Sequence, residues 1–406
     1  MRERPGHRST TAHLQALYPF VSEGGLGCGG VYIGRDLFGG AFCFDAFELY
    51  RSGQLTSPNM IVAGQLGRGK SALVKCFALR QMAFGRRVVV MDPKGEYGDI
   101  ARFCGTEPIR LEPGGKTRLN PLDDRIAQHE QSRLLHAISA ATLDRPLRPQ
   151  ERTALEQALR VSSSGRRHAT LPRVIDALLQ PDEESALAAA TDAATLLEWG
   201  REAAFELRRL VTGDLRGMFD ARTSRDIHLD RPLVVLDLSS VYDSDALGIL
   251  MVCAAAWLQG VLSRDADTKT VFVLDEAWAI LADLAIARWV QASFKLARGR
   301  GMQNIAVIHR FSDLAATGAA GSQQERLASG LLSDAETAVV YGQPHAEIDV
   351  ARRVLGLSAA EARLLPQLDK GIALWKVGER SFLVWHQLGA TERALVDTDQ
   401  RMNGAA

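Results

Sequence analysis

Short runs of apolar residues alternate with helical stretches over much of the chain. Runs at 60–63 and 87–91 flank a Gly-rich turn and a helical stretch from 70 to 84. Four further apolar runs lie at 232–239, 270–278, 304–311 and 337–343. A strand, a helix and a second strand in this order are typical of a parallel sheet. The pattern predicts a doubly wound, mostly parallel α/β core.

The pattern changes between residues 123 and 230. Strand-like runs are absent there, and apolar residues recur at helical spacing, as in LLHAISAATL and VIDALL. We therefore expect an all-helical subdomain at 123–230, inserted into an α/β domain made of residues 56–122 and 231–397.

Both ends of the chain add β-type sequence. Residues 1–55 contain GVYIGRDLFGGAFCFDAFELY, in which two short β-type runs flank Gly39 and Gly40, as in a hairpin. Towards the C-terminus, Glu379 and Arg380 separate GIALWKVG from SFLVWHQL, and we interpret these runs as a hairpin at the edge of the sheet. Residues 398–406 are expected to form a flexible tail.

Composition and charge limit the class of protein. The chain has 406 residues, 46% hydrophobic and 24% charged, as expected for a soluble globular protein. Its 48 basic and 48 acidic side chains cancel, so any binding to nucleic acid or an anionic membrane must come from a local patch. The most apolar run, 246–258, is shorter than the ~20 residues of a membrane span, and we interpret it as a buried helix.

The cysteines and the N-terminal sequence indicate a cellular compartment. MRERPGHRST lacks the apolar stretch of a secretory signal. The five cysteines have no paired spacing, which suits free thiols in a reducing cytosol. We expect a cytoplasmic protein without lipid insertion of its own, and a peripheral position at the inner face of the cell membrane stays open.

The Gly-rich turn carries the first candidate chemistry. Its sequence GQLGRGKS matches G-x-x-x-x-G-K-[ST] and lies between a predicted strand and a predicted helix. In such a loop the backbone N–H groups turn towards phosphates, Lys70 reaches the β and γ phosphates, and the Ser71 hydroxyl binds Mg²⁺. The alternative is a chance Gly-rich turn. The predicted nucleotide-binding residues are Gly64, Gln65, Leu66, Gly67, Arg68, Gly69, Lys70, Ser71 and Ala72.

A second motif, VFVLDE, ends in two carboxylates at Asp275 and Glu276. A buried parallel strand delivers such acids to the ligand edge of the sheet. There Asp275 would hold Mg²⁺, and Glu276 would orient and deprotonate the attacking water. The alternative is a helix start, where the first turn favours acids. The phosphate loop upstream favours the catalytic interpretation, and the two motifs together predict ATP and Mg²⁺ as ligands.

Three other acidic residues follow predicted strands. Asp92 and Glu96 lie in DPKGEY, and both would support the site or contact the base or ribose, although Pro and Gly also suit a plain turn. Asp237 ends another strand and is a weaker candidate, because such aspartates often cap the next helix.

One histidine and two arginines complete the set of candidate site residues. His309 ends the NIAVIHRF run, where it would sense the γ phosphate or form a structural hydrogen bond. Arg298 and Arg300 lie in an Arg-Gly-Arg-Gly turn, which is either solvated or supplies an arginine finger to a neighbouring subunit. The trans finger is favoured because the local motifs show no cation besides Lys70 to neutralise the γ phosphate.

With these residues placed, the chain resembles the conjugal-transfer and type IV secretion traffic ATPases (VirB/TraC-like) of the FtsK and HerA superfamily, especially actinobacterial ones. The resemblance rests on GQLGRGKS, DPKGEY, VLDEAW and the Asn120-Pro121-Leu122 segment, and it covers most of residues 30–402. It implies a RecA-like fold, with Lys70 and Ser71 in the phosphate loop, Asp275 at the metal and Glu276 as the catalytic glutamate. The family usually has Gln where this chain has His309 and Arg310, and its longer members carry a large N-terminal domain that this sequence lacks.

The resemblance also implies partners. Family members form hexamers and power DNA or protein transfer through an envelope-spanning channel. We therefore expect a homo-oligomeric ATPase that contacts DNA transiently and docks on membrane-embedded channel components. Two alternatives stay open: a HerA-like DNA translocase in repair or packaging, and a nucleotide-gated assembly module with little hydrolysis.

Overall fold

The computed structural model describes residues 25–396 except 165–167, 214, 226, 243, 245–246, 263–267, 278–290, 292–293, 296, 313–329 and 331–333. The predicted C-terminal tail at 398–406 lies outside the described residues.

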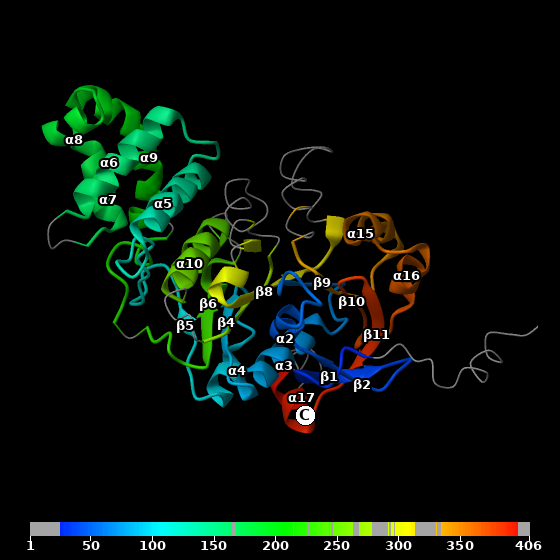
Figure 1. The fold of residues 1–406 in the computed structure, drawn as a ribbon. Coiled ribbons are helices and arrows are strands. Elements are labelled where there is room, and N and C mark those ends of the chain that lie inside the picture. Colours follow the sequence, from blue (N-terminus) through cyan, green and yellow to red (C-terminus); the bar gives the residue numbers. More distant parts are fainter. Residues whose placement is uncertain are drawn as a thin grey trace, which may run out of the picture.

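A mixed sheet of eleven described strands runs through the centre of the molecule (Figure 1). Its order is β2-β1-β11-β10-β9-β3-β8-β7-β4-β6-β5. The strands are β1 (Val31–Asp36), β2 (Ala41–Phe44), β3 (Met60–Ala63), β4 (Arg87–Asp92), β5 (Ile109–Arg110), β6 (Leu233–Asp237), β7 (Thr270–Leu274), β8 (Met302–Ile308), β9 (Thr337–Tyr341), β10 (Ile372–Val377) and β11 (Arg380–His386).

The strands from β9 to β5 in this order pair in parallel, whereas β10, β11, β1 and β2 pair antiparallel. The central parallel strands are buried along their whole length, as their continuous apolar runs require when helices cover both faces. Parallel pairing brings the carboxyl ends of β3, β8, β7 and β4 to one edge of the sheet. This edge is where ligands bind in such folds.

Helices cover both faces of the sheet. On one face pack α2 (Ala46–Arg51), α3 (Lys70–Ala83), α4 (Gly98–Phe103) and α17 (Ala390–Val396). On the other pack α10 (Leu247–Leu262), α15 (Ile348–Leu355) and α16 (Ala359–Leu364). Short 3-10 turns occur at η1 (Ser239–Val241), η2 (Arg298–Arg300), η3 (His345–Glu347) and η4 (Leu365–Gln367). In the apolar run at 246–258, the described residues from Leu247 onwards belong to the buried helix α10, as predicted.

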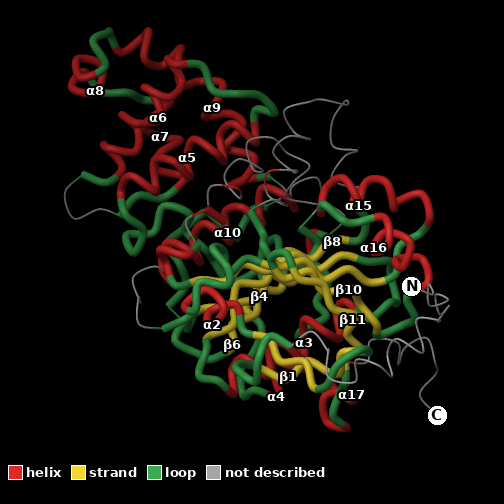
Figure 2. Tube along the Cα trace, turned by 45° about the vertical axis from the view of Figure 1, so that its right-hand side comes forward, coloured by secondary structure: helices red, strands yellow, loops and turns green. Residues whose placement is uncertain are grey.

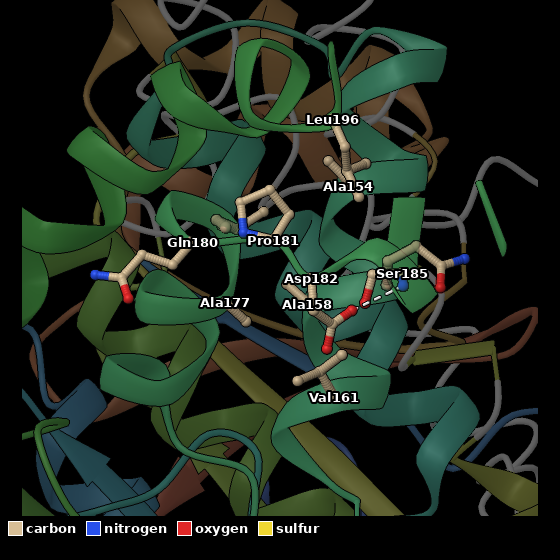
Figure 3. Close-up of a pocket in the computed structure, with 11 residues that line it drawn as sticks. Ala154, Ala158, Val161, Ala177, Gln180, Pro181, Asp182, Ser185 and Leu196 are labelled. Atoms are coloured by element: carbon tan, nitrogen blue, oxygen red, sulfur yellow. Dashed lines mark hydrogen bonds between the residues drawn. The ribbon is translucent and has the colours of Figure 1, made fainter. Parts of the chain in front are cut away.

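Five helices form a lobe beside the sheet, drawn in teal and green in Figure 1 and in red at the upper left of Figure 2. They are α5 (Gln128–Thr142), α6 (Pro149–Ser162), α7 (Leu171–Leu179), α8 (Glu183–Ala188) and α9 (Ala193–Thr212). Helix α5 packs against α10, and Trp257 Nε1 of α10 donates to Asp123 Oδ2 over 3.3 Å. The lobe and this face of the sheet share one apolar core.

The C-terminal hairpin forms as predicted, but its predicted place at the edge of the sheet is wrong. Strand β10 pairs with β9, and β11 pairs with β1, so β2 is the edge strand. Aromatic packing explains the difference, because the rings of Phe42 and Phe44 each lie 5.2 Å from that of Trp375. The N-terminal hairpin therefore extends the sheet beyond β11.

The RecA-like fold class is confirmed by this sheet, while the domain boundaries stay a prediction. All five cysteines are free thiols. Within the described ranges, no helix has the length and apolar character to cross a membrane.

Candidate phosphate and catalytic site

The loop from Gly64 to Gly69 connects β3 to α3 at the ligand edge. A Cβ on Gly64 would lie 2.6 Å from the Cβ of Tyr341 on β9, so only glycine lets the loop pass this strand. Gly69 has φ 111°, a conformation that favours glycine, immediately before α3 begins. The Gln65 N–H donates to the Gly342 carbonyl over 3.2 Å, and the Gly371 N–H donates to that of Arg68 over 3.0 Å. Neighbouring strands thus hold the loop in place.

Lys70, the first residue of α3, turns its side chain back under this loop. Its Nζ donates to the carbonyls of Gly64 and Gln65, the latter over 3.0 Å, and lies 3.1 Å from His309 Nδ1. Burial lowers the pKa of Lys70 to about 8, although the carboxylates of Glu276 and Asp275 oppose this shift. A buried ammonium whose hydrogen bonds go mainly to neutral carbonyls would be stabilised by an anionic ligand.

Glu276 and His309 meet on neighbouring strands. Glu276 follows β7 and His309 follows β8, and His309 Nε2 lies 2.7 Å from Glu276 Oε1. With its proton on Nε2, the imidazole can donate to Glu276 and accept from Lys70 at Nδ1. His309 therefore links the phosphate-loop lysine to the candidate general base through one ring.

The backbone of Glu276 is unusual. Its φ of 53° places a non-glycine residue in the left-handed region. The Ala277 N–H donates to the Val307 carbonyl over 3.0 Å, so pairing with β8 continues past the end of β7 and fixes this turn. Such conformations cluster at functional sites, where surrounding structure maintains them.

Asp275 lies in a cluster of carboxylates. Burial and the nearby Glu276, Asp92 and Glu96 raise the pKa of Asp275 to about 7. The Tyr97 hydroxyl donates to Asp275 Oδ2 over 3.3 Å. Burial likewise raises the pKa of Asp92 to about 6, although the Tyr97 N–H donates to Asp92 Oδ2 over 2.8 Å. The other oxygen of Asp92 is buried and has no hydrogen-bond partner in the described part of the chain.

These residues fit Mg²⁺ that binds together with a nucleotide. The raised pKa of Asp275 and the unpartnered Asp92 oxygen both mark negative charge that a cation would stabilise. In the described ranges, no three His, Cys, Asp or Glu side chains could hold a metal alone. Mg²⁺ usually takes few protein ligands and completes its shell with phosphates and water. Ser71, at the start of α3, and Asp275 are the residues that would hold it.

The remaining acidic candidates, Glu96 and Asp237, lie at the same edge of the sheet, and their recorded contacts are with other side chains or with backbone. Glu96 Oε2 is 3.4 Å from Nζ of the buried Lys75 on α3. Asp237 Oδ1 accepts the Ser239 N–H over 3.0 Å, at the first residue of η1, and Asp237 Oδ2 accepts from Arg110 Nε over 3.1 Å. The roles of Asp92 and Glu96 at the site stay predictions.

The backbone at Arg298 and Arg300 lies away from this site. Both lie in η2, which precedes β8, at the edge of the sheet opposite the phosphate loop. Arg300 forms an ion pair with Glu130 of α5, in the helical lobe. A role in a neighbouring subunit's site stays a prediction.

The expectation that Lys70 is the only cation in the local motifs is wrong. Lys94, from DPKGEY after β4, forms an ion pair with Glu276, and its Nζ lies 3.4 Å from His309 Nε2. The sequence contained the signal, because Lys94 follows a predicted strand by two residues. The Lys94 side chain lies close to Glu276 because β4 and β7 are neighbours in the sheet.

Comparison with known families finds a match to part of the chain. Residues 53–253 match the family described as the central domain of helicase HerA. This segment is similar to a HerA-type central domain. The match includes the phosphate loop and DPKGEY, and it ends inside α10. No curated protein matches the chain.

Solved structures resemble more of the chain than the HerA domain alone. VirB4 of Thermoanaerobacter pseudethanolicus has a TM-score of 0.73 at 20% identity, over 91% of this chain and 100% of that one. The plasmid coupling protein TrwB in complex with the ATP analogue ADPNP has a TM-score of 0.58 at 14% identity, over 82% of this chain and 86% of that one. TrwB in complex with ADP and Mg²⁺ has a TM-score of 0.56 at 16% identity over the same shares. All three are less than 25% identical to this chain, and they show that it shares their fold.

Proposed function

We propose that this protein is an ATP-hydrolysing motor that powers conjugative transfer of DNA, or of protein, through a type IV secretion-like channel. The observation that carries the enzymatic part is the contact chain from Lys70 through His309 to Glu276. It joins a phosphate-binding cation to a candidate general base on adjacent strands.

The reaction follows from these positions. The loop N–H groups and Lys70 would bind the β and γ phosphates, and Ser71 and Asp275 would hold Mg²⁺, which would supply further positive charge. Glu276 accepts a proton from a water that attacks the γ phosphorus in line, while the bond to the β–γ bridging oxygen breaks. ADP and phosphate are the products. His309, in contact with both Lys70 and Glu276, reports the presence of the γ phosphate to the base.

The likeness to VirB4 and TrwB supports the transfer role, since TrwB is a conjugative coupling protein and a plasmid coupling protein. By analogy the protein works in the cytoplasm as a homo-oligomer of hexameric type, with transient DNA contact, against a membrane-embedded channel. Arg300, or else Arg298, completes the neighbouring subunit's site as a trans finger.

A second function is a HerA-like DNA translocase in repair or packaging. The family match over residues 53–253 favours it. A third, a nucleotide-gated assembly module with little hydrolysis, is favoured by the ion pair that engages Glu276 with Lys94.

Steady-state ATP turnover, measured alone, with single-stranded DNA and with duplex DNA, separates these functions. The motor predicts turnover that DNA increases, with Lys70→Ala as the inactive control because it removes the cation on the β and γ phosphates. Stimulation by duplex alone would favour the translocase. Turnover no higher than that of Lys70→Ala under all conditions would contradict both motors and favour the assembly module.

A further inference from the structure

We propose that Lys94, in addition to His309, is a residue by which this site distinguishes a nucleoside triphosphate from a diphosphate. In this role Lys94 holds Glu276 in an ion pair until a γ phosphate takes the place of the carboxylate. The inference rests on the proposed function, because it assumes that the phosphate loop binds nucleotide.

The first support is the order of side chains along the ligand edge. The strands β3, β8, β7 and β4 are consecutive neighbours, so the residues that follow them lie in the order Lys70, His309, Glu276 and Lys94. Lys70 contacts one nitrogen of the His309 ring, and Lys94 lies near the other. A phosphate chain bound at Lys70 would extend towards Lys94 only if it carries a γ group.

The second support is the contrast in burial across the ion pair. The side chain of Glu276 is 3% exposed, whereas that of Lys94 is 27% exposed. Lys94 comes from a turn that includes Gly95 (φ 70°), and its Nζ lies 5.8 Å from the centre of the Tyr242 ring. Lys94 is therefore the partner that can move, while Glu276 is fixed by its buried turn.

The third support is electrostatic. A buried carboxylate needs a partner, and in this structure Lys94 and His309 both provide one for Glu276. An ion pair with an ammonium makes a carboxylate a weaker base, so a general base gains proton affinity when such a contact is lost. The γ phosphate carries more charge than a carboxylate and competes for the same ammonium. ADP cannot compete in this way, so it leaves Glu276 engaged.

The test compares binding of ADP and of a non-hydrolysable ATP analogue, each with Mg²⁺, by calorimetry. In Lys94→Ala the analogue should bind about 10- to 100-fold more weakly, the size of a lost hydrogen bond to a charged group, while ADP affinity stays within about twofold. Lys94→Arg should recover most of the loss. Lys376→Ala is the matched control, because Lys376 pairs with Ala338 near the start of β9, at the opposite edge.

A double-mutant cycle tests the exchange of partners. Glu276→Gln should tighten binding of the analogue, because Lys94 is then released from its ion pair, and this gain should disappear in the Lys94→Ala/Glu276→Gln variant. A gain of the same size in both backgrounds would come from removing negative charge near the phosphates, and it would overturn the exchange.

The outcomes also separate this inference from the proposed function. If the wild-type protein binds both nucleotides and Lys94→Ala weakens both equally, or neither, the role of Lys94 is overturned while the nucleotide site stands. If the wild-type protein binds neither nucleotide, the proposed function and the inference fail together.

Discussion

Several ionisable side chains in this protein are buried where water cannot solvate their charge. Lys70, Asp275 and Glu276 are each less than one-tenth exposed, and Glu276 also has positive φ. A strained backbone of this kind costs of order 1–3 kcal/mol. The site is thus less stable than an apolar one would be, and the bound charges of a nucleotide and Mg²⁺ would offset part of this cost.

His386, at the end of β11, gives a test at the residue scale that does not involve catalysis. Burial and the nearby Arg80 lower its pKa from 6.5 to about 4. Between these values the unfolded chain binds a proton that the folded chain does not, so the free energy of unfolding should fall as the pH drops from 6.5 to 4. At about 1.4 kcal/mol per pH unit the loss from this group is at most about 3 kcal/mol.

Chemical denaturation of the wild type and His386→Gln at several pH values measures this contribution. The other titrating groups are common to both proteins, so the difference between the two curves isolates His386. The wild type should lose more stability than the variant between pH 6.5 and 4. Parallel curves would show that the folded imidazole accepts a proton as readily as the unfolded one.

The sequence predicted those site residues whose role depends on local spacing. GQLGRGKS and VLDE each place their side chains by a short strand and the turn that follows it. Lys94 was missed because its partner Glu276 lies on a distant segment, and only the order of the strands brings the two together. The contact of His309 with Lys70 depends on the same order.

At the scale of elements, continuous apolar runs predicted the buried strands well. The runs at 60–63 and 87–91 correspond to β3 and to β4, which includes one further residue, Asp92. Such runs are reliable because strands buried on both faces need apolar side chains at every position.

The order of strands was harder to predict than their existence. The sequence indicated two hairpins but not that β1 pairs with β11, since this contact joins opposite ends of the chain. Packing of Phe42 and Phe44 on Trp375 decides the arrangement, and no local pattern encodes it.

At the scale of the whole molecule, the helical lobe and the sheet are physically coupled. They share one apolar core, and the Arg300–Glu130 ion pair joins η2 to α5 across them. Arg300 therefore has a contact within its own chain that any role in a neighbouring subunit must accommodate.

Mixing inactive subunits tests the trans finger. Arg300→Ala should lower turnover by ~10³ or more while leaving nucleotide binding and assembly intact, and mixing it with Lys70→Ala should restore some activity. Glu130→Ala is the matched control, because it breaks the same ion pair but retains the guanidinium. Equal losses in Arg300→Ala and Glu130→Ala would show that the ion pair is structural. Full activity of a stable monomer would contradict a trans finger.

The central claim is that Glu276 is the general base of an ATPase site. Its most direct test is the initial rate of ATP hydrolysis at saturating Mg²⁺-ATP in the wild type and in Glu276→Gln. The amide keeps the shape of the side chain but cannot accept the proton, so the account predicts a rate at least ~100-fold lower with nucleotide binding retained. A variant that hydrolyses ATP at a rate close to the wild type would contradict the account.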